Sequence, residues 1–162
     1  MIGKEGEKMK KIYLAGAIEV YGRKGNYDEA NQWRKKVKNY FSNYLLDFEC
    51  VNPMDYYLYD SNYHKSEFEV MRFDLRPVKQ ADIVLVNLDY IRDSVGTSDE
   101  IFYAYMLGKP VIGFIEGRIA ELDVASIMNM IHPWKYYQID RIETGPGALD
   151  KAMEYIKDFY GG

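Results

Sequence analysis

The stretch Ala81-Asp82-Ile83-Val84-Leu85-Val86-Asn87-Leu88 is the segment from which the fold can be read. It is a nearly continuous apolar run, and a strand of this kind is typical of a parallel sheet that is covered by helices on both faces. The segment therefore predicts a buried strand inside an α/β domain.

Strands and helices are predicted to alternate on both sides of this segment. Further strands are expected at residues 12–17, 48–51, 111–115 and 136–139. Apolar residues that recur every three or four positions predict helices at residues 26–46, 66–80, 97–107 and 148–160. Pro77 is expected to kink the second helix or end it early. The alternation predicts one three-layer, Rossmann-like α/β domain with a doubly wound, parallel, five-stranded sheet.

The composition is that of an ordinary globular domain. Of 162 residues, 48% are hydrophobic and 28% are charged, and the net charge is −4. This mild acidity argues against a nucleic-acid surface, and no apolar stretch reaches the ~18 residues of a membrane span. We expect a flexible N-terminal tail at residues 1–10, a single domain at residues 11–162, and a cytoplasmic location.

Metal and cofactor chemistry is not indicated by the sequence. The chain has one cysteine, Cys50, and its two histidines, His64 and His132, lie far apart. This rules out a disulfide framework and a cysteine-based metal cluster, and the histidines have no metal-ligand spacing. The turn at residues 15–17 is not a dinucleotide fingerprint, and there is no Walker A motif. We expect neither a metal nor a cofactor.

The segment at residues 93–100, Asp-Ser-Val-Gly-Thr-Ser-Asp-Glu, follows the 81–88 strand and begins a helix. In a parallel sheet the carboxyl ends of the strands form the binding edge. The helix dipole there would keep Glu100 ionised, which suits a nucleophile. The same residues also fit a capping box, in which Glu100 only caps a helix that begins at Thr97. The local sequence alone favours the capping role.

Asp74 is a second carboxylate of interest, on the helix predicted before the 81–88 strand. We expect it on the opposite face from the apolar stripe that includes Met71 and Leu75. It is either a solvated surface charge or a group that leans over the strand ends toward Glu100. Two carboxylates in different environments are what an acid and nucleophile pair needs.

Three groups of residues together carry a family resemblance. They are residues 12–16 (Ile-Tyr-Leu-Ala-Gly), Asp74 followed by residues 81–85, and residues 96–100 followed by residues 108–111 (Gly-Lys-Pro-Val). In this order and spacing they resemble the nucleoside 2-deoxyribosyltransferase family. The resemblance implies a flavodoxin-like fold and an enzyme that cleaves the N-glycosidic bond of 2′-deoxynucleosides. It would transfer deoxyribose to an acceptor base through a covalent glutamyl intermediate.

The resemblance also implies roles for single residues. Glu100 would attack C1′, Asp74 would handle the proton on the leaving base, and Tyr13 would position the nucleophile and the sugar. Glu100 is then expected to face a pocket and not to close a capping box. The expected substrate-binding residues are Gly16, Asp93, Ser94, Gly96, Ser126 and Asn129.

Two other functions stay open. Relatives in this family hydrolyse nucleoside 5′-monophosphates, and Ser94 lies six residues before Glu100, as a phosphate-binding serine does in them. Ser126, donated by a neighbouring subunit, would be the second such serine, whereas Asn129 would suit a free 5′-hydroxyl. A non-catalytic nucleotide-binding or sensor module is the third possibility. The resemblance further implies a homodimer or higher homo-oligomer with shared active sites.

Tyrosine is unusually frequent, with 16 residues. Four of them follow the strand at residues 48–51 and would lie at the binding edge, where their rings could stack on a base: Tyr56, Tyr57, Tyr59 and Tyr63. If stacking is their role, replacing Tyr57 or Tyr59 should raise KM more than it lowers kcat.

Overall fold

A five-stranded, all-parallel sheet forms the centre of the protein. The computed structural model describes residues 8–44, 47–56 and 66–161. The strand order is β2-β1-β3-β4-β5, the flavodoxin-like arrangement. The strands are β1 (Lys10–Gly16), β2 (Phe48–Val51), β3 (Ile83–Asn87), β4 (Val111–Ile115) and β5 (Arg141–Thr144). The α/β class and the parallel sheet predicted from the sequence are confirmed.

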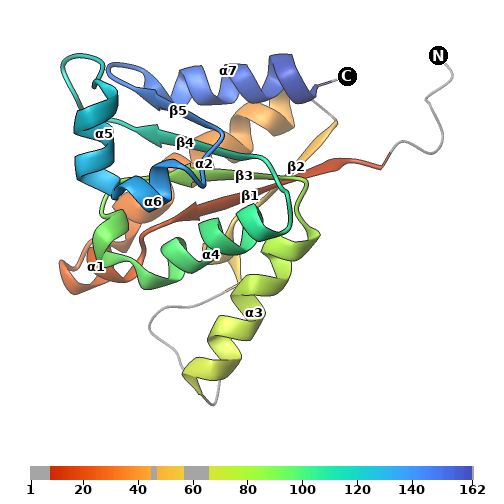
Figure 1. Ribbon diagram of the computed structural model, residues 1–162. Coiled ribbons are helices and arrows are strands. Elements are labelled where there is room, and N and C mark those ends of the chain that lie inside the picture. The colour runs from red at the N-terminus through yellow and green to blue at the C-terminus, as the bar shows by residue number, and fades with distance from the viewer. Residues whose placement is uncertain (1–7, 45–46, 57–65, 162) are drawn as a thin grey trace, which may run out of the picture.

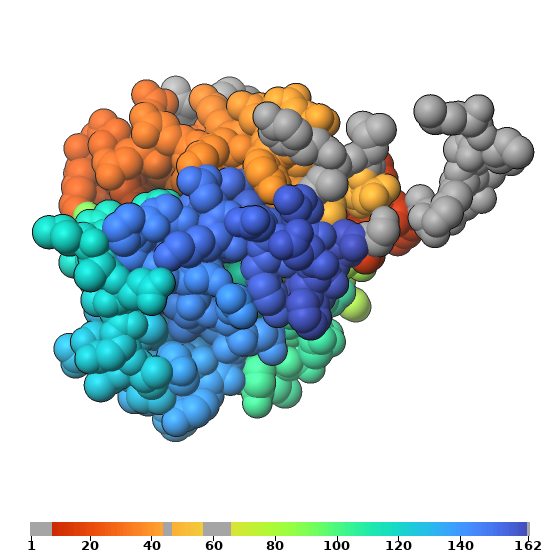
Figure 2. Space-filling model, turned by 90° about the horizontal axis from the view of Figure 1, so that it is seen from above, coloured from red at the N-terminus to blue at the C-terminus, as the bar shows by residue number. Residues whose placement is uncertain are grey.

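Helices cover both faces of the sheet (Figure 1). One face packs against α2 (Tyr27–Tyr44) and α7 (Ala148–Tyr160), which lie side by side in Figure 2 in orange and dark blue. The other face packs against α3 (Glu67–Gln80), α4 (Val95–Met106) and α5 (Val124–Ile131). The described residues also include four short helical segments: α1 (Glu19–Arg23), η1 (Pro53–Asp55), η2 (Ile91–Asp93) and α6 (Pro133–Tyr136).

The two-sided burial of β1 and β3 explains their apolar sequences. In β1, Ile12 and Leu14 pack against the α2 and α7 layer, whereas Tyr13 and Ala15 pack against the α4 layer. All five residues of β3 are buried. Side chains alternate across a strand, so a central parallel strand needs a continuous apolar run and not an alternating one.

The strand predicted at residues 136–139 is wrong. Tyr136 ends the short helix α6, which Pro133 begins, and the fifth strand lies at Arg141–Thr144. Among the described residues β5 is an edge strand that pairs with β4, and its first residue, Arg141, is exposed. An edge strand tolerates polar residues, so the sequence of β5 lacks the apolar run that predicts a buried strand.

The second predicted helix also differs from expectation. α3 continues through Pro77 to Gln80 instead of ending early. Val78 and Ala81, on either side of this end, are fully buried, and their packing offsets the hydrogen bond that proline cannot donate. α1, α5 and α6 were not predicted, because each is too short to show a helical period clearly.

Among the described residues, no helix is both long and apolar enough to cross a bilayer.

Two isoleucines test the position of the core. Ile112 in β4 is fully buried, whereas Ile119 is 98% exposed. We predict that Ile112→Ala lowers the free energy of unfolding by about 2–5 kcal/mol, because it leaves a cavity between sheet and helices. The matched change Ile119→Ala should stay within about 0.5 kcal/mol of the unaltered protein. Urea unfolding measures both values, and equal effects would contradict the assigned core.

Candidate active site

The candidate site is built around a buried pair from β1 and α4. The Tyr13 hydroxyl donates a 3.0 Å hydrogen bond to Oε1 of Glu100. Tyr13 is fully buried and Glu100 is 9% exposed. The two residues are 87 positions apart in the chain, so only the packing of α4 on the sheet brings them together.

The capping box considered for Glu100 does not form. α4 begins at Val95 with Ser94 as its N-cap, so Thr97 already lies inside the helix. The Ser94 hydroxyl donates to Oγ1 of Thr97 at 2.7 Å, and Glu100 accepts from Tyr13. The expectation that Glu100 does not cap its own helix is confirmed.

The ionised state expected for Glu100 at neutral pH is contradicted by its surroundings. Burial, followed by the charge of Asp74, raises the pKa of Glu100 from its usual value of 4.5 to about 8. The hydrogen bond from Tyr13 and the charge of Arg34 act in the opposite direction. The dipole argument fails because the helix begins earlier than expected. Glu100 therefore lies beyond the first turn, where the dipole effect falls off.

Asp74 is half-buried on α3 and lies close enough to act on both members of the pair. Its charge raises the pKa of Glu100. Burial raises the pKa of Tyr13 well above its usual value, and the charges of Glu100 and Asp74 raise it further. The fold therefore brings together the three residues that the sequence nominated as catalytic.

The residues nominated for substrate binding lie in several places. Gly16 ends β1 and is buried, while Asp93 ends η2 and is exposed. The sequence predicts a turn at Gly96, but in the structure Gly96 lies inside α4. A side chain at this position would meet open space. Ser126 and Asn129 are exposed on α5. No hydrogen bond among the described residues links these two side chains to Tyr13 or Glu100.

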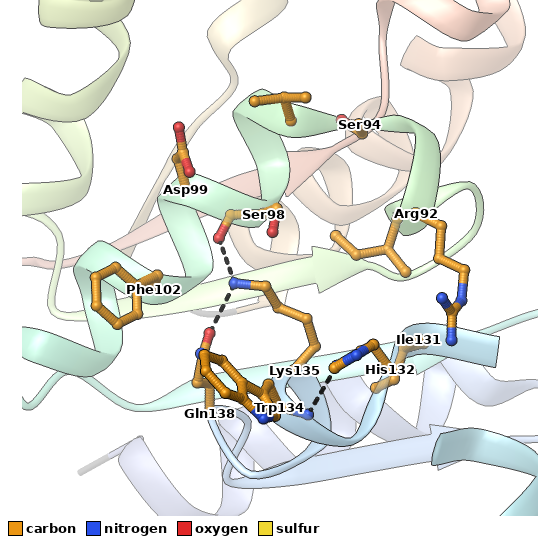
Figure 3. Close-up of a pocket in the computed structure, with 12 residues that line it drawn as sticks. Arg92, Ser94, Ser98, Asp99, Phe102, Ile131, His132, Trp134, Lys135 and Gln138 are labelled. Carbon is orange, nitrogen blue, oxygen red and sulfur yellow. Dashed lines mark hydrogen bonds between the residues drawn. The ribbon is translucent and has the colours of Figure 1, made fainter. Parts of the chain in front are cut away.

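A hollow of about 500 Å³ lies between α4 and α6 (Figure 3). Lys135 crosses it and donates to the carbonyl oxygen of Ser98 and to Oε1 of Gln138, both at 2.8 Å. Ser94 and Ser98 line the hollow, but Tyr13 and Glu100 do not. Residues four apart share a helix face, and Glu100 is on the opposite side of α4 from Ser98. This hollow is therefore separated from the buried pair by the helix.

Sequence reasoning missed two polar residues near the strand ends. Asp89 lies two residues after the end of β3, and its N–H donates to Oδ1 of Asn87 at 3.0 Å. Burial is the main cause of the raised pKa of Asp89. Its position just after a central strand was the available signal. Arg34 on α2 is fully buried. It falls on the stripe that contains Ala30, Val37 and Phe41, a signal that was passed over because arginine is usually a surface residue.

The tyrosine-rich segment lies mostly outside the described residues. This holds for Tyr57, Tyr59, Tyr63 and His64. Tyr56 is described and is 56% exposed, with its ring 5.9 Å from that of Phe73 in an edge-to-face contact.

Within the part of the chain that is described, no group of three or more His, Cys, Asp or Glu side chains could hold a metal ion. The pair and Asp74 together provide a phenol and two carboxyl groups, which can act as acid, base or nucleophile.

Comparison with known proteins bears on this arrangement. The family model for nucleoside 2-deoxyribosyltransferase matches residues 12–129, a range that contains Tyr13, Asp74 and Glu100. The chain belongs to the nucleoside 2-deoxyribosyltransferase family. A comparison with curated protein sequences finds no match.

Three solved structures are similar to this chain at low sequence identity, and the first of them shares its fold. A conserved protein from Enterococcus faecalis V583 is 16% identical with a TM-score of 0.68, and the alignment covers 93% of this chain and 99% of that one. The CMP N-glycosidase BcmB of Clostridium botulinum is 15% identical, with a TM-score of 0.48 and coverage of 93% and 100%. A 2-deoxyribosyltransferase from Bacillus psychrosaccharolyticus is 24% identical, with a TM-score of 0.47 and coverage of 79% and 90%.

The raised pKa of Glu100 predicts how stability depends on pH. A carboxyl group whose pKa is about 8 in the folded state and near 4.5 unfolded binds its proton more tightly when folded. Its contribution to stability is therefore complete below pH 4.5 and is lost as the pH rises toward 8. The loss is about 1.4 kcal/mol for each pH unit inside this window.

Glu100→Gln replaces the carboxyl group by a neutral amide of the same shape, which does not titrate. The loss of stability with rising pH should therefore be absent in this variant. We predict that the variant matches the unaltered protein near pH 4 and becomes progressively more stable than it toward pH 8. Denaturant unfolding at several pH values measures the difference. A difference that stays constant with pH would show that Glu100 titrates normally.

Proposed function

We propose that the protein cleaves the N-glycosidic bond of 2′-deoxynucleosides and transfers the deoxyribosyl group to an acceptor base. The observation that carries this proposal is the buried carboxylate of Glu100, held by the Tyr13 hydroxyl with Asp74 close by. Cleavage at C1′ passes through an oxocarbenium-like centre, which requires a nearby anion and a proton for the leaving group. Membership of the family supports the same reaction class.

The reaction is proposed to run in two steps. An oxygen of the Glu100 carboxylate bonds to C1′ while the C1′–N bond breaks, and the departing base nitrogen keeps the electron pair and takes a proton delivered by Asp74. A nitrogen of the acceptor base then attacks C1′ and gives its proton to Asp74. The ester bond to Glu100 breaks in this step, which restores the carboxylate.

The environment of Glu100 suits both states that this cycle needs. A desolvated carboxylate is a stronger nucleophile than one in water, and the Tyr13 hydroxyl fixes the direction of one oxygen. Because the charge of Asp74 raises the pKa of Glu100, the two carboxyl groups disfavour being ionised together. In the proposed first step Asp74 starts protonated and Glu100 ionised, and the negative charge passes to Asp74 as the ester forms, so the two groups are never charged at the same time.

The central test is base exchange. We predict that incubation of the protein with a 2′-deoxynucleoside and a second free base yields the exchanged deoxynucleoside, measured by chromatography. Glu100→Gln should abolish exchange, because an amide cannot form the glycosyl ester. Glu154→Gln, the same change at an exposed position on α7 across the sheet, should leave exchange unaltered.

Other outcomes of this assay would replace the proposal. Base release from nucleoside 5′-monophosphates, without exchange, would make the protein an N-glycosidase. The geometry around Ser94 gives that alternative little support, because its hydroxyl is bonded to Thr97 and it lines the hollow beyond α4. Binding of nucleotides with no turnover would favour a sensor module.

Tyr13→Phe tests the hydrogen bond within the pair. The Tyr13 hydroxyl lowers the pKa of Glu100, so its removal should raise that pKa above about 8. Because only the ionised carboxylate attacks C1′, kcat/KM should rise with pH through the pKa of Glu100, and the rise should move to higher pH in the variant. A pH–rate profile that keeps its position would exclude Tyr13 as a partner of the reacting carboxylate.

Self-association of the chain is part of the same proposal. It is supported by large apolar side chains that are exposed on α3 and α4: Phe68, Met71, Phe102, Tyr105 and Met106. We predict a homodimer or larger homo-oligomer by light scattering, and Met106→Glu should shift it toward the monomer. A monomer at micromolar concentration would contradict this part of the proposal.

A further inference from the structure

The end of β1 has a strand on only one side. Its pairing with β2 stops at Tyr13 opposite Val51, whereas its pairing with β3 continues to Gly16 opposite Asn87. In a parallel strand, alternate carbonyl groups point to the same neighbour. The carbonyl groups of Leu14 and Gly16 therefore point toward the β2 side, beyond the last residue of β2.

Arg34 takes the position of the missing strand there. Its Nε donates to the carbonyl oxygen of Leu14 at 3.2 Å, and its Nη2 donates to that of Gly16 at 2.9 Å. Its Nη1 donates to the carbonyl oxygen of Ala30 on α2. One guanidinium group thus ties the carboxyl end of β1 to the helix from which Arg34 comes.

The packing around Arg34 leaves it little freedom. The side chain is fully buried, and its guanidinium carbon lies 4.6 Å from the centre of the Trp33 ring. A Cβ atom at Gly16 would be 3.1 Å from Trp33 and 3.2 Å from Nη2 of Arg34. Gly16 thus permits the close approach of Arg34 to the strand end, and the positive charge has a fixed place.

We propose that Arg34 is a positioning residue of the active site, which holds the end of β1 in place and sets a fixed positive charge behind the Tyr13–Glu100 pair. This inference rests on the proposed function, in which Glu100 reacts in its ionised form. Strand β1 carries Tyr13, so the contacts of Arg34 with the carbonyl oxygens of Leu14 and Gly16 hold the backbone directly after Tyr13 in place.

The charged and titratable groups that act on Glu100 come from four elements. Asp74 from α3 and Asp99 from α4 raise its pKa, while the Tyr13 hydroxyl from β1 and Arg34 from α2 lower it. Arg34 also lowers the pKa of Tyr13 against the effect of burial. Arg34 is the positive charge in this balance, and a neutral residue in its place would favour the protonated Glu100.

Two substitutions separate the charge of Arg34 from its hydrogen bonds. Arg34→Lys keeps the positive charge but lacks the planar guanidinium group that donates several hydrogen bonds, whereas Arg34→Met lacks both the charge and the donors. We expect Arg34→Met to raise the pKa of Glu100 and to move the rise of kcat/KM to higher pH. Activity at pH 7 should then fall about tenfold for each pH unit by which the rise moves. Arg34→Lys should lower kcat but leave the rise near its original pH.

The pKa of Glu100 can be measured without turnover, by ¹³C NMR of the side-chain carboxyl group during a pH titration, with Glu100→Gln to assign the signal. A Glu100 pKa that is the same in folded Arg34→Met as in the unaltered protein would overturn the role of Arg34, whatever the activity. Equal loss of activity in both variants at every pH would also overturn it, because that pattern reflects stability alone. An inactive unaltered protein would instead count against the proposed function.

Arg34→Gln serves if Arg34→Met does not fold, because its amide NH₂ group can still donate hydrogen bonds to the strand end while the charge is removed. A further readout needs no Arg34 variant. The Nε signal of Arg34 should shift in ¹⁵N NMR as Glu100 titrates, and this shift should vanish in Glu100→Gln. A signal that does not respond to pH in the unaltered protein would show that the two groups are not coupled.

Discussion

The hydrogen bond from Tyr13 to Glu100 joins the interior strand β1 to helix α4 inside the protein. A carboxylate in such a place loses most of its hydration, so its ionised form needs donors and positive charge nearby. Tyr13 supplies the donor, and Arg34 supplies the charge, while Asp74 opposes both. The result is a group with a pKa of about 8, which can gain or lose its proton near neutral pH.

The sheet topology makes this balance possible. β1 lies between β2 and β3, and helices from opposite faces of the sheet reach its carboxyl end: α4 with Glu100 and α2 with Arg34. Gly16 has no side chain, and this lets the guanidinium of Arg34 reach the strand end. The candidate site is therefore built from regular elements, and the groups in it are held by the same packing that stabilises the domain.

Glu100 shows how local and long-range information can disagree. The spacing of Thr97 and Glu100 fits a capping box, and only the similarity of the wider sequence to a known family favoured a catalytic role. In the structure the helix begins at Val95, which puts Glu100 too deep in the helix to reach the cap, and its side chain meets Tyr13 of the sheet instead. Helix ends are set by packing and by the N-cap residue, so local spacing predicts them within one or two residues at best.

The sequence by itself determined the α/β class, the parallel sheet and four of the five strands, because burial on both faces of a strand demands a continuous apolar run. It also identified Tyr13, Asp74 and Glu100 as residues of interest. Only the tertiary structure decided that these three lie together, that Arg34 supports the end of β1, and that Glu100 favours its protonated form. Contacts between residues far apart in the chain, and the desolvation that they cause, depend on how the layers pack, and no local pattern of residues contains that information.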